Sequence, residues 1–597
     1  MKTNQIPERL SALRKYMEDH NLDVFIVPST DPHLSEYPPK AWESRKWITG
    51  FTGSAGTAAI SKNQAGLWTD SRYFLQAADQ LSGTGFDLYK MGVAGTPDLI
   101  DWVIDQAGNN GTVGIDGMVY ASSEANILKE KLSAKGIKLE TGLNPFDTIW
   151  TDRPAIPKNP IFTLPEDISG ETTQHKIARI IAELDKCDAD GIIIAALDAV
   201  AWTFNIRGND VDFNPVGVAY GYVSKNESIL FIDPDKLTEK VSNELKAEGV
   251  KLAGYNDIYP YVKGLPASTK LCITGSKINY ALRQAIPSNC KVIDVPISPI
   301  DKMKSMKNPI ELQGFRNAMI RDGVALVRFY RWMEKALADG ELDELTIAEK
   351  LREYRSKQDN YVGESFSTIA GYAGHGAIVH YSATEASNVK VEPKGLLLID
   401  SGAQFMDGTT DITRTWAVGE TTEQMRIDYT NVLKGHIALA TAIFPQGTRG
   451  SQLDILAHKP LWDTCKTYWH GTGHGIGHFL NVHEGPQNIR LEENPTTLEI
   501  GMVTSNEPGV YLANEYGIRT ENLIVTQEYK KTEDFGIFYH FETITLCPID
   551  TTSVEKDLLT EDEVNWLNHY HAMVYEKLAP HLDEEEKVWL RNKTKAI

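Results

Sequence analysis

The sequence predicts a mixed α/β and α+β protein in which two related N-terminal α/β domains precede a larger C-terminal domain. Two observations carry this prediction. The N-terminal half contains the same run of sequence signals twice, and a strong helix-start signal near residue 306 opens a segment of different character. The length of 597 residues agrees with several domains, since a single hydrophobic core stops growing at about 250 to 300 residues.

The repeated signals begin with an apolar strand and end with a strand that stops at an aspartate. The first copy reads DVFIVPSTDPHLSEY, WITGFTGSAGTAAIS and GLWTDSRYF, and the second reads DGIIIAALDAVAWTFNIRG, VAYGYVS and SILFIDPD. Each copy contains a tryptophan closely followed by glycine, at Trp47 and Trp202. The closing aspartates are Asp70 and Asp233. Self-similarity of this kind indicates a duplicated structural unit, so we predict two related α/β domains.

A proline-rich segment separates the two repeated units. Residues 153–165 contain four prolines among short polar stretches, and no helical period survives there. We therefore predict a first domain over residues 1–155 and a second, related domain over residues 160–303.

A helix-start signal marks the third domain. Asn308, Pro309 and Glu311 are an N-cap, a proline at the first helical position and a capping-box acid, and a long helical pattern follows them. We therefore place a third domain at residues 306–597. A helical extension, which we expect to begin at about residue 553, closes this domain.

The charge balance and the apolar pattern exclude several partners. The chain has 60 Lys and Arg residues against 81 Asp and Glu residues, a net charge of −21. Nucleic-acid phosphates and anionic membranes repel such a chain, so we expect neither nucleic acid nor membrane as a partner. We find no apolar run of about 18 residues and no apolar signal-peptide core, and expect a cytoplasmic protein. Five scattered cysteines without CxxC spacing argue against a disulfide framework and a thiolate zinc site.

Histidines gather in one part of the chain, and such clustering indicates a functional site. Eight of the fifteen histidines fall within about a hundred residues of the third domain. For four of them the simpler interpretation is a surface position or a hydrogen-bonded core position. These four are His375, His436, His458 and His478, and the other four are His380, His470, His474 and His483.

Acidic residues at strand ends are more informative. In GLLLIDSGAQFMDGTTDITRTWAV an apolar strand ends at Asp400, a Gly-rich loop follows, and a second strand opens at Asp411, eleven residues later. In GMVTSNEPGVYLANEYGIRTENLIVT a strand ends at Glu507, a turn-rich loop follows, and the returning strand carries Arg519 and Glu521 on one face. The two units are interpreted as halves of one pseudo-symmetric site.

Four ionised carboxylates held together would repel one another strongly, so we expect positive charge among them. Two divalent cations would balance the four negative charges, and His474 in YWHGTGHGIGHFLNVHEG is a suitable neutral fifth ligand. Oxygen ligands with one imidazole and no thiolate favour manganese ahead of zinc, with cobalt also possible. Solvated acids at strand ends would explain any one of these residues, but not all of them together.

Other catalytic patterns are missing from the sequence. His474 and His478 are four residues apart, but the acid of an HExxH motif is absent and glycines between them disfavour a helix. The sequence contains neither a GxSxG nucleophile elbow nor a GxxxxGK[ST] phosphate-binding loop. The glycines around His474 are better explained as backbone that makes room for a substrate.

The constellation of acids and His474 resembles that of the pita-bread metallopeptidases, and among them the aminopeptidase P group with three domains. The resemblance covers nearly the whole chain. It rests on WITGFTGSAG and LWTDSR in the first domain, AWTFNIRGND and FNPV in the second, and GHGAIVHYSAT, LIDSGAQFMDGTTDITRT, HGTGHGIGHFLNVHEGP, EPG and GIRTEN in the third. It implies two creatinase-like N-terminal domains, a pita-bread catalytic domain with two divalent metal ions, and a homodimer.

The resemblance also implies a division of labour among the ligands. Asp400 would bind one metal ion, and His474 would bind the other together with Glu507. Asp411 and Glu521 would bridge the two ions. Glu507 would also belong to the catalytic residues.

Further roles follow from the same resemblance. His380 and His483 match catalytic and substrate-contacting histidines near the scissile bond, and His470 matches a histidine that lines the substrate pocket. The simpler alternative for these three histidines is that they only orient the metal ligands through hydrogen bonds. Arg519, two residues before Glu521, would fix that acid or contact the substrate.

The implied activity is removal of the N-terminal residue from peptides with proline in the second position. A water shared by two cations would have a lowered pKa and attack the peptide carbonyl carbon. Prolidase, which cleaves only Xaa-Pro dipeptides, is the first alternative and could use the same five ligands, but it usually has one N-terminal domain. An inactive peptide-binding relative is a second alternative, but it should have lost ligands that this sequence retains.

Overall fold

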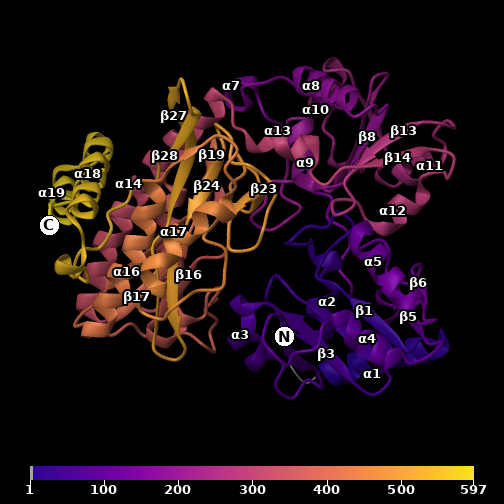
Figure 1. Cartoon of the computed structure of the whole chain (residues 1–597), viewed down its shortest axis with the longest axis horizontal. Helices are drawn as coiled ribbons and strands as arrows, with labels where there is room; N and C mark the ends of the chain where they lie inside the picture. The colour runs from indigo at the N-terminus through magenta and orange to yellow at the C-terminus, as the bar shows by residue number, and fades with distance from the viewer. Residues whose placement is uncertain (1–4) are drawn as a thin grey trace. The chain divides into compact units, whose positions relative to one another are not determined.

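The computed structural model describes residues 5–597, which form two compact units (Figure 1). One unit runs to Pro165 and resumes over Glu171–Ile300. The other contains Glu166–Gly170 and Asp301–Ile597. Among the helices described, none combines the length and apolar character needed to cross a membrane.

The first unit begins with a domain built on one six-stranded sheet. Its strand order is β4-β3-β2-β1-β5-β6. The strands are β1 (Val24–Val27), β2 (Thr57–Ser61), β3 (Ala65–Thr69), β4 (Asp87–Lys90), β5 (Thr112–Ile115) and β6 (Lys138–Glu140), and the helices are α1 (Ile6–Asp19), α2 (Ser44–Thr49), α3 (Phe74–Gln80), α4 (Leu99–Ala107), α5 (Ser122–Ser133) and α6 (Phe146–Ile149). Strand β1 is buried along its whole length, as expected for its unbroken apolar sequence VFIV.

A second sheet in the first unit repeats this topology. Its order is β12-β11-β10-β8-β13-β14, and each neighbouring pair has the same direction as its counterpart in the first sheet. The strands are β8 (Gly191–Ile194), β10 (Ala219–Ser224), β11 (Ser228–Ile232), β12 (Val250–Ala253), β13 (Lys270–Ile273) and β14 (Lys291–Asp294), and the longer helices are α8 (Thr173–Lys186), α9 (Leu197–Thr203), α10 (Glu239–Ala247), α11 (Ile258–Lys263) and α12 (Tyr280–Ala285). The predicted pair of related α/β domains is confirmed.

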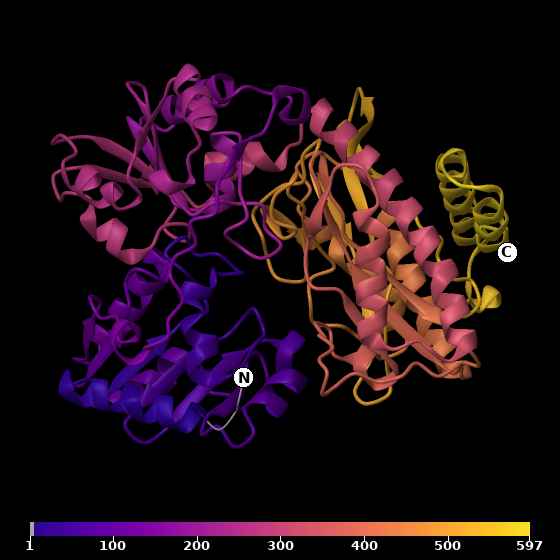
Figure 2. The ribbon, with the colours of Figure 1, turned by 180° about the vertical axis from the view of Figure 1, so that it is seen from behind.

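The second unit is organised around a long helix, α14 (Pro309–Asp339). It starts where the sequence predicts. The Asn308 side chain accepts hydrogen bonds from the Ile310 and Glu311 N–H groups, and the Glu311 carboxylate accepts one from the Asn308 N–H. This reciprocal cap satisfies N–H groups that the first turn of a helix leaves unpaired. Seen from behind in Figure 2, α14 runs along the strands of its unit.

Two segments of this unit each consist of a strand, an inserted hairpin and a second strand that pairs with the first. In the first, β17 (Leu396–Ser401) and β20 (Ile412–Ala417) pair in a sheet with β16 (Ile369–Tyr372). The hairpin between them, β18 (Ala403–Phe405) and β19 (Gly408–Thr409), pairs instead with β15 (Tyr361–Glu364).

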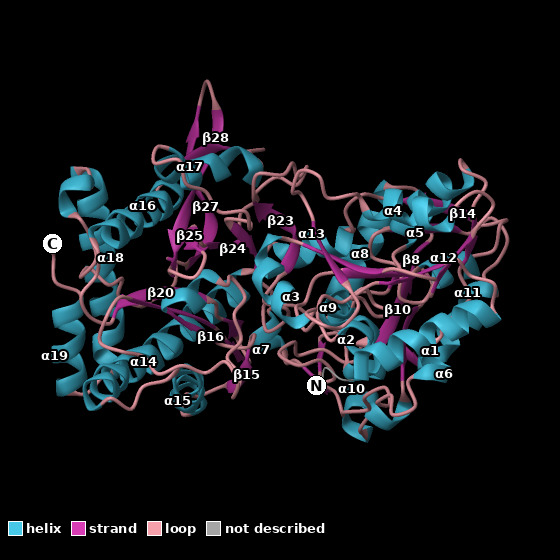
Figure 3. Ribbon diagram, turned by 90° about the horizontal axis from the view of Figure 1, so that it is seen from below, coloured by secondary structure: helices cyan, strands magenta, loops and turns pink. Residues whose placement is uncertain are grey.

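In the second segment, β24 (Val503–Asn506) and β27 (Asn522–Thr532) pair within a six-stranded sheet, and the hairpin of β25 (Gly509–Leu512) and β26 (Tyr516–Arg519) lies between them in sequence. The other strands of that sheet are β21 (Ile443–Pro445), β22 (Gly473–Gly475), β23 (Glu484–Ile489) and β28 (Gly536–Thr543). In Figure 3 the β27–β28 hairpin projects beyond the neighbouring helices of the unit.

The structure corrects the sequence prediction for both connections. The expected Gly-rich and turn-rich loops are hairpins in their own right, and Arg519 ends β26 whereas Glu521 precedes β27. Arg519 and Glu521 therefore do not lie on one continuous strand. In the second hairpin Asn514 turns the chain with a left-handed backbone (φ 64°), a conformation that asparagine tolerates better than most residues. A short strand on each side of such a turn is easily taken for a loop.

Helices cover the sheets of the second unit. They are α15 (Glu344–Ser356), α16 (Glu423–Ala440), α17 (Gly450–Trp462), α18 (Glu561–Leu578) and α19 (Glu584–Lys593). The last two, yellow in Figure 1, pack against α14. Their apolar faces, including Leu567, Val574 and Leu590, join a core cluster with Phe315 and Met319 of α14. The helical extension predicted from about residue 553 is thus packed onto the rest of the second unit.

Candidate metal centre

The four acids predicted from the sequence come together at the ends of the paired strands. Asp400 lies near the end of β17 and Asp411 just before β20, while Glu507 follows β24 and Glu521 precedes β27. Register places Asp400 opposite Thr413 and Asn506 opposite Asn522, so both acid pairs lie at corresponding strand ends. We refer to these four residues as the acid cluster.

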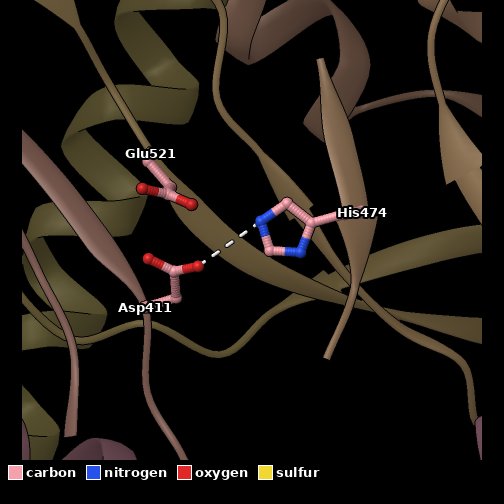
Figure 4. Close-up of side chains that lie close together, drawn as sticks. All are labelled: Asp411, His474 and Glu521. Carbon is pink, nitrogen blue, oxygen red and sulfur yellow. Dashed lines mark ion pairs between the residues drawn. The ribbon is translucent and has the colours of Figure 1, made fainter. Parts of the chain in front are cut away.

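His474 of β22 faces the acid cluster. Oxygen atoms of Asp411 and Glu521 and a ring nitrogen of His474 all lie within 4.8 Å of one another. Figure 4 shows the three side chains pointing toward a common space. His474 Nε2 is 3.5 Å from Asp411 Oδ2 and 3.5 Å from Glu507 Oε1. This spacing suits a metal ion between the groups, since ligand-to-metal distances are about 2.0 to 2.2 Å for nitrogen and oxygen ligands of zinc.

The His474 ring is oriented by its other nitrogen. Nδ1 lies 3.0 Å from the carbonyl oxygen of Gly475, which can only accept, so Nδ1 carries the proton. Nε2 is then left with a lone pair directed at the carboxylates. A histidine that ligates a metal commonly has its second nitrogen fixed in this way.

Asp400 is held by Arg519. Its Oδ2 accepts a hydrogen bond of 2.6 Å from Arg519 Nη2, whereas its buried Oδ1 has no hydrogen-bond partner among residues 5–597. A buried carboxylate oxygen without a partner costs free energy unless something else binds it. A cation at this oxygen would remove that cost, so the residues fit the metal ions that the donor set implies.

The charge state of the acid cluster supports the same conclusion. Burial, with a further contribution from the neighbouring carboxylates, raises the pKa of Asp411 and of Glu521 well above the ordinary value. Burial also raises the pKa of Glu507 to about 7, although Arg519 acts in the opposite direction. Without cations these three acids, Asp411, Glu507 and Glu521, thus resist ionisation. Divalent cations would stabilise all four carboxylates in the charged form.

Arg519 occupies a place that differs from the predicted one. It pairs directly with Asp400 and reaches Glu521 only through Thr413, whose Oγ1 accepts from Arg519 Nε at 3.0 Å and donates to Glu521 Oε2 at 2.7 Å. The expectation that Arg519 fixes Glu521 is therefore corrected to an indirect contact. The reason is the hairpin, which ends β26 at Arg519 and brings the guanidinium beside β17 and β20.

A chain of hydrogen bonds links Arg519 to His470. Arg519 Nη1 donates to the Tyr511 hydroxyl at 2.6 Å, and that hydroxyl lies 2.8 Å from His470 Nε2. His470 Nδ1 lies 2.8 Å from the Gly471 carbonyl oxygen, so Nδ1 is the protonated nitrogen and Nε2 accepts from Tyr511. Sequence analysis missed Tyr511, whose only local signal is its place four residues after Glu507.

The remaining predicted histidines lie close to the same site. The His483 ring packs edge-on against His474, with ring centroids 4.4 Å apart. His380 lies in the connection after β16, and the carbonyl oxygen of the preceding residue, Val379, accepts a 3.5 Å hydrogen bond from Arg519 Nη2. Both histidines are partly exposed. The structure thus brings His483 against a proposed ligand and the backbone beside His380 against Arg519.

The four histidines with a simpler expected role contact protein groups. Their partners are the Glu344 carboxylate for His375, the Asn506 carbonyl for His436, Asp454 for His458 and the Asp407 carbonyl for His478. Burial lowers the pKa of His436 to about 3. His436 is therefore a neutral core residue, and it also accepts a hydrogen bond from Asn522.

Sequence analysis also missed Arg414, a fully buried arginine on β20. Its guanidinium donates to the Glu521 carbonyl oxygen at 2.6 Å, to Asn522 Oδ1 at 2.7 Å and to the Tyr570 hydroxyl of α18 at 2.9 Å. Arg414 therefore ties the backbone of Glu521 to the C-terminal helices. The one available signal was a charged residue inside a strand that alternates apolar and hydroxyl side chains.

The fold and the acid cluster together define the class of the protein as a metallopeptidase of the pita-bread type with two creatinase-type domains before it. Residues 9–147 and again 152–311 match the creatinase/prolidase N-terminal domain. Residues 313–528 match metallopeptidase family M24, and residues 537–597 match the C-terminal region of that family.

Full-length relatives make the assignment narrower. The chain is 41% identical over 612 residues to a probable Xaa-Pro aminopeptidase P of Coprinopsis cinerea, covering 99% of this chain and 98% of that one. A Tuber melanosporum protein described in the same words is 39% identical over 622 residues, with 100% of both chains covered. The chain belongs to the Xaa-Pro aminopeptidase P group of metallopeptidase family M24.

A solved structure agrees with this assignment. The X-prolyl aminopeptidase of Caenorhabditis elegans, described as a cytosolic enzyme with a di-nuclear active site, superposes with a TM-score of 0.95. It is 35% identical, and the match covers 99% of this chain and 100% of that one.

Proposed function

We propose that this protein is an Xaa-Pro aminopeptidase that removes the N-terminal residue from peptides with proline in the second position. The observation that carries the proposal is the buried acid cluster with His474, in a chain whose relatives match it over its full length. Full-length similarity favours an aminopeptidase over a prolidase, because it includes both N-terminal domains. The presence of all five predicted ligands argues against an inactive, peptide-binding relative.

We propose two divalent cations, with manganese ahead of zinc and cobalt because oxygen ligands dominate. Asp400 would hold one cation, His474 and Glu507 the other, and Asp411 and Glu521 would bridge them. When bound, such cations supply a water of lowered pKa and polarise the carbonyl under attack.

The protein's own residues supply the remaining steps. We propose that His483 and His380 donate hydrogen bonds to the substrate carbonyl oxygen as negative charge develops there. Glu507 would accept the proton released by the attacking water and pass it to the leaving proline nitrogen. Arg519 would keep Asp400 oriented, and His470 would line the pocket, held by Tyr511.

The substrate preference follows from the chemistry of the bond. The nitrogen of an Xaa-Pro bond carries no hydrogen, so an enzyme cannot position it through an N–H donor and must recognise the proline ring by shape. The free amino terminus is positively charged and would be attracted by acidic groups beside the metal ions. Together these requirements place the cut after the first residue.

Three further statements belong to the proposal. We propose the domain limits predicted from the sequence, because the family segments follow the same order along the chain. We also propose a cytoplasmic location, which the description of the Caenorhabditis elegans relative supports. Finally, we propose a homodimer, as the family resemblance implies, and light scattering of the purified chain would test it.

One assay separates the candidate functions. The purified protein is stripped with a chelator, reloaded with manganese or zinc, and given an Arg-Pro-Pro tripeptide, an Xaa-Pro dipeptide and an Ala-Ala tripeptide, with products followed by mass spectrometry. We expect metal-dependent release of arginine from Arg-Pro-Pro, and little or no cleavage of the other two. Cleavage of the dipeptide alone would replace the proposal with a prolidase.

A pair of matched variants shows whether the acid cluster is responsible. Asp411→Asn should abolish arginine release, whereas the same change at the exposed Asp463, which forms an ion pair with Lys459, should leave it intact. Equal activity of the two variants would remove the acid cluster from the proposal.

A further inference from the structure

One buried acid outside the acid cluster gathers an unusual number of donors from a single short segment. Glu344, the first residue of α15, is 0% exposed. Its carboxylate accepts hydrogen bonds from the Tyr372 N–H at 3.0 Å, from His375 Nδ1 at 2.9 Å and from the Tyr381 hydroxyl at 2.9 Å. An acid buried this completely is stable only when its oxygens are well satisfied, as they are here.

All three donors lie in, or immediately before, the segment that carries His380. We call residues 373–389, which follow β16, the His380 loop. Tyr372 lies immediately before this loop, His375 lies near its start, and Tyr381 is the residue after His380. The rings of His375 and Tyr381 stack at a centroid distance of 4.5 Å, so the two donors also support each other. Glu344 thus holds the loop on both sides of His380.

The start of α15 also holds the far end of the His380 loop. The Glu344 N–H donates to the Val389 carbonyl oxygen at 3.3 Å, and the Leu345 N–H donates to Asn388 Oδ1 at 3.2 Å. These are N–H groups of the first helical turn, which have no partner within the helix. The loop therefore accepts hydrogen bonds from the N–H groups of the first turn of α15, and the Glu344 carboxylate accepts hydrogen bonds from donors in and beside the loop.

On its other side the His380 loop lies against β26, the strand that ends at Arg519. Backbones approach so closely that a Cβ on Gly517 would collide with the carbonyl oxygen of Gly376. Arg519, which pairs with Asp400, also reaches the Val379 carbonyl oxygen. The loop is thus fixed between Glu344 and the strand that orients a proposed metal ligand.

We propose that Glu344 is a positioning residue for His380, acting through His375 and Tyr381. The proposal rests on the proposed function, in which His380 donates to the substrate carbonyl oxygen. Catalytic groups must be held within a fraction of an ångström, since a displacement of about 1 Å can cost on the order of 100-fold in rate. One buried carboxylate that fastens a loop on both sides of its catalytic histidine meets this requirement.

The first test compares single variants of the metal-loaded, full-length protein. We expect Glu344→Gln to lower kcat for Arg-Pro-Pro by roughly 10- to 100-fold, with KM and metal content changed less than twofold. Tyr381→Phe and His375→Phe, which each remove one donor, should lower kcat by smaller factors. Tyr261→Phe is the matched control, because it removes a hydroxyl that donates to Glu227 in the other unit, and it should leave kcat unchanged.

A double-mutant cycle distinguishes positioning from general structural damage. If Glu344 acts through His380, then Glu344→Gln should cost less than twofold in a His380→Ala background. A loss of the same size in both backgrounds would overturn the proposal. If Glu344→Gln does not fold, the same cycle is run with Tyr381→Phe, with the same two outcomes.

A measurement that needs no activity keeps this proposal separate from the proposed function. Hydrogen exchange of the His380 loop should become faster in Glu344→Gln and in Tyr381→Phe, while exchange in the Tyr261→Phe control stays as in the wild type. Unchanged exchange of the loop in both site variants would contradict the proposal even if the enzyme is active. Faster exchange in an enzyme that fails to cut Arg-Pro-Pro would instead contradict only the proposed function.

Discussion

The two halves of the metal centre have the same plan but different electrostatics. Each half places two acids at the ends of paired strands with a hairpin inserted between them. In the first half Asp400 is paired with the guanidinium of Arg519 at 2.6 Å. In the second half Glu507 Oε1 accepts a hydrogen bond of 3.2 Å from the Ser505 hydroxyl and lies 3.5 Å from the imidazole Nε2 of His474.

Because their surroundings differ in charge, the two proposed cation positions are not equivalent. A cation beside Asp400 meets a carboxylate whose charge Arg519 already offsets, and it is repelled by that guanidinium. A cation beside Glu507 meets a lone pair of His474, whereas the hydrogen-bonded ion pair of Arg519 is with Asp400. We therefore expect the position beside His474 to bind first and more tightly.

The largest expected effect comes from Glu521, the acid of the second half that is proposed to bridge both cations. Glu521→Gln should reduce kcat/KM by far more than the roughly 10- to 100-fold that loss of an outer-shell partner costs, because both proposed cations lose a bridging ligand. The same change at the exposed Glu492, which forms an ion pair with Arg490, is the control. Steady-state kinetics with measured metal content checks this, and a Glu521→Gln enzyme with near-normal activity would refute the shared role.

The inequivalence of the halves is tested by comparing Asp400→Asn with His474→Ala. We expect wild-type protein to show two manganese-binding events in calorimetry. Asp400→Asn should weaken only the second event, and His474→Ala should weaken the first by more than 10-fold. If instead Asp400→Asn removed the first event, the order inferred from Arg519 would be wrong.

The pH dependence of the stability of the metal-free protein should reveal how much the ionised acid cluster destabilises the fold. Glu507 has a pKa of about 7 in the folded protein against 4.5 ordinarily, so the folded state binds more protons than the unfolded state between these values. Stability of the metal-free protein should therefore fall as pH rises from 4.5 to 7, and the raised pKa values of Asp411 and Glu521 should add to the fall.

Thermal unfolding measures this effect. We expect the Tm of the metal-free protein to drop by on the order of a few degrees over that pH range, beyond any change common to the whole protein. Saturating manganese should flatten the drop, because it binds the ionised carboxylates. The same slope with and without manganese would show that the cations do not interact with the acid cluster.

The smallest expected effect concerns the contact between the halves. Thr413→Val keeps the side-chain shape but removes the hydroxyl that joins Arg519 to Glu521. We expect manganese affinity to fall by roughly 10-fold, the lower end of what outer-shell partners cost. Thr441→Val, which removes a hydroxyl bonded to helix carbonyls, should have no such effect. Chelator competition would measure both affinities, and equal values would remove Thr413 from the account.

Much of this architecture is readable from local sequence. The duplicated domains show because each copy repeats its strands in order, and the structure confirms the same strand order in both sheets. The four acids of the cluster can be found in the sequence because each stands at the boundary of an apolar strand. The spacing between the two acids of each pair can be counted there directly. Patterns within single continuous segments of the sequence suffice for both conclusions.

The connections within the site are not readable in that way. Arg519 and Thr413 are 106 residues apart in sequence, and Arg414 and Tyr570 are 156 apart. No periodicity encodes such contacts, which is why Thr413, Arg414 and Tyr511 were missed and why the direct pairing of Arg519 with Asp400 was not predicted. The role of Glu344 was not predicted for the same reason, because its partners in and beside the His380 loop become its neighbours only when β16 packs against α15.

The proposed activity requires two cations in the acid cluster. Metal-free protein would be titrated with manganese while bound metal per chain and release of arginine from Arg-Pro-Pro are measured in the same samples. We predict two manganese ions per chain and arginine release that appears only as they bind. Binding of no more than one ion per chain, or cleavage by the metal-free protein at the same rate, would contradict the account.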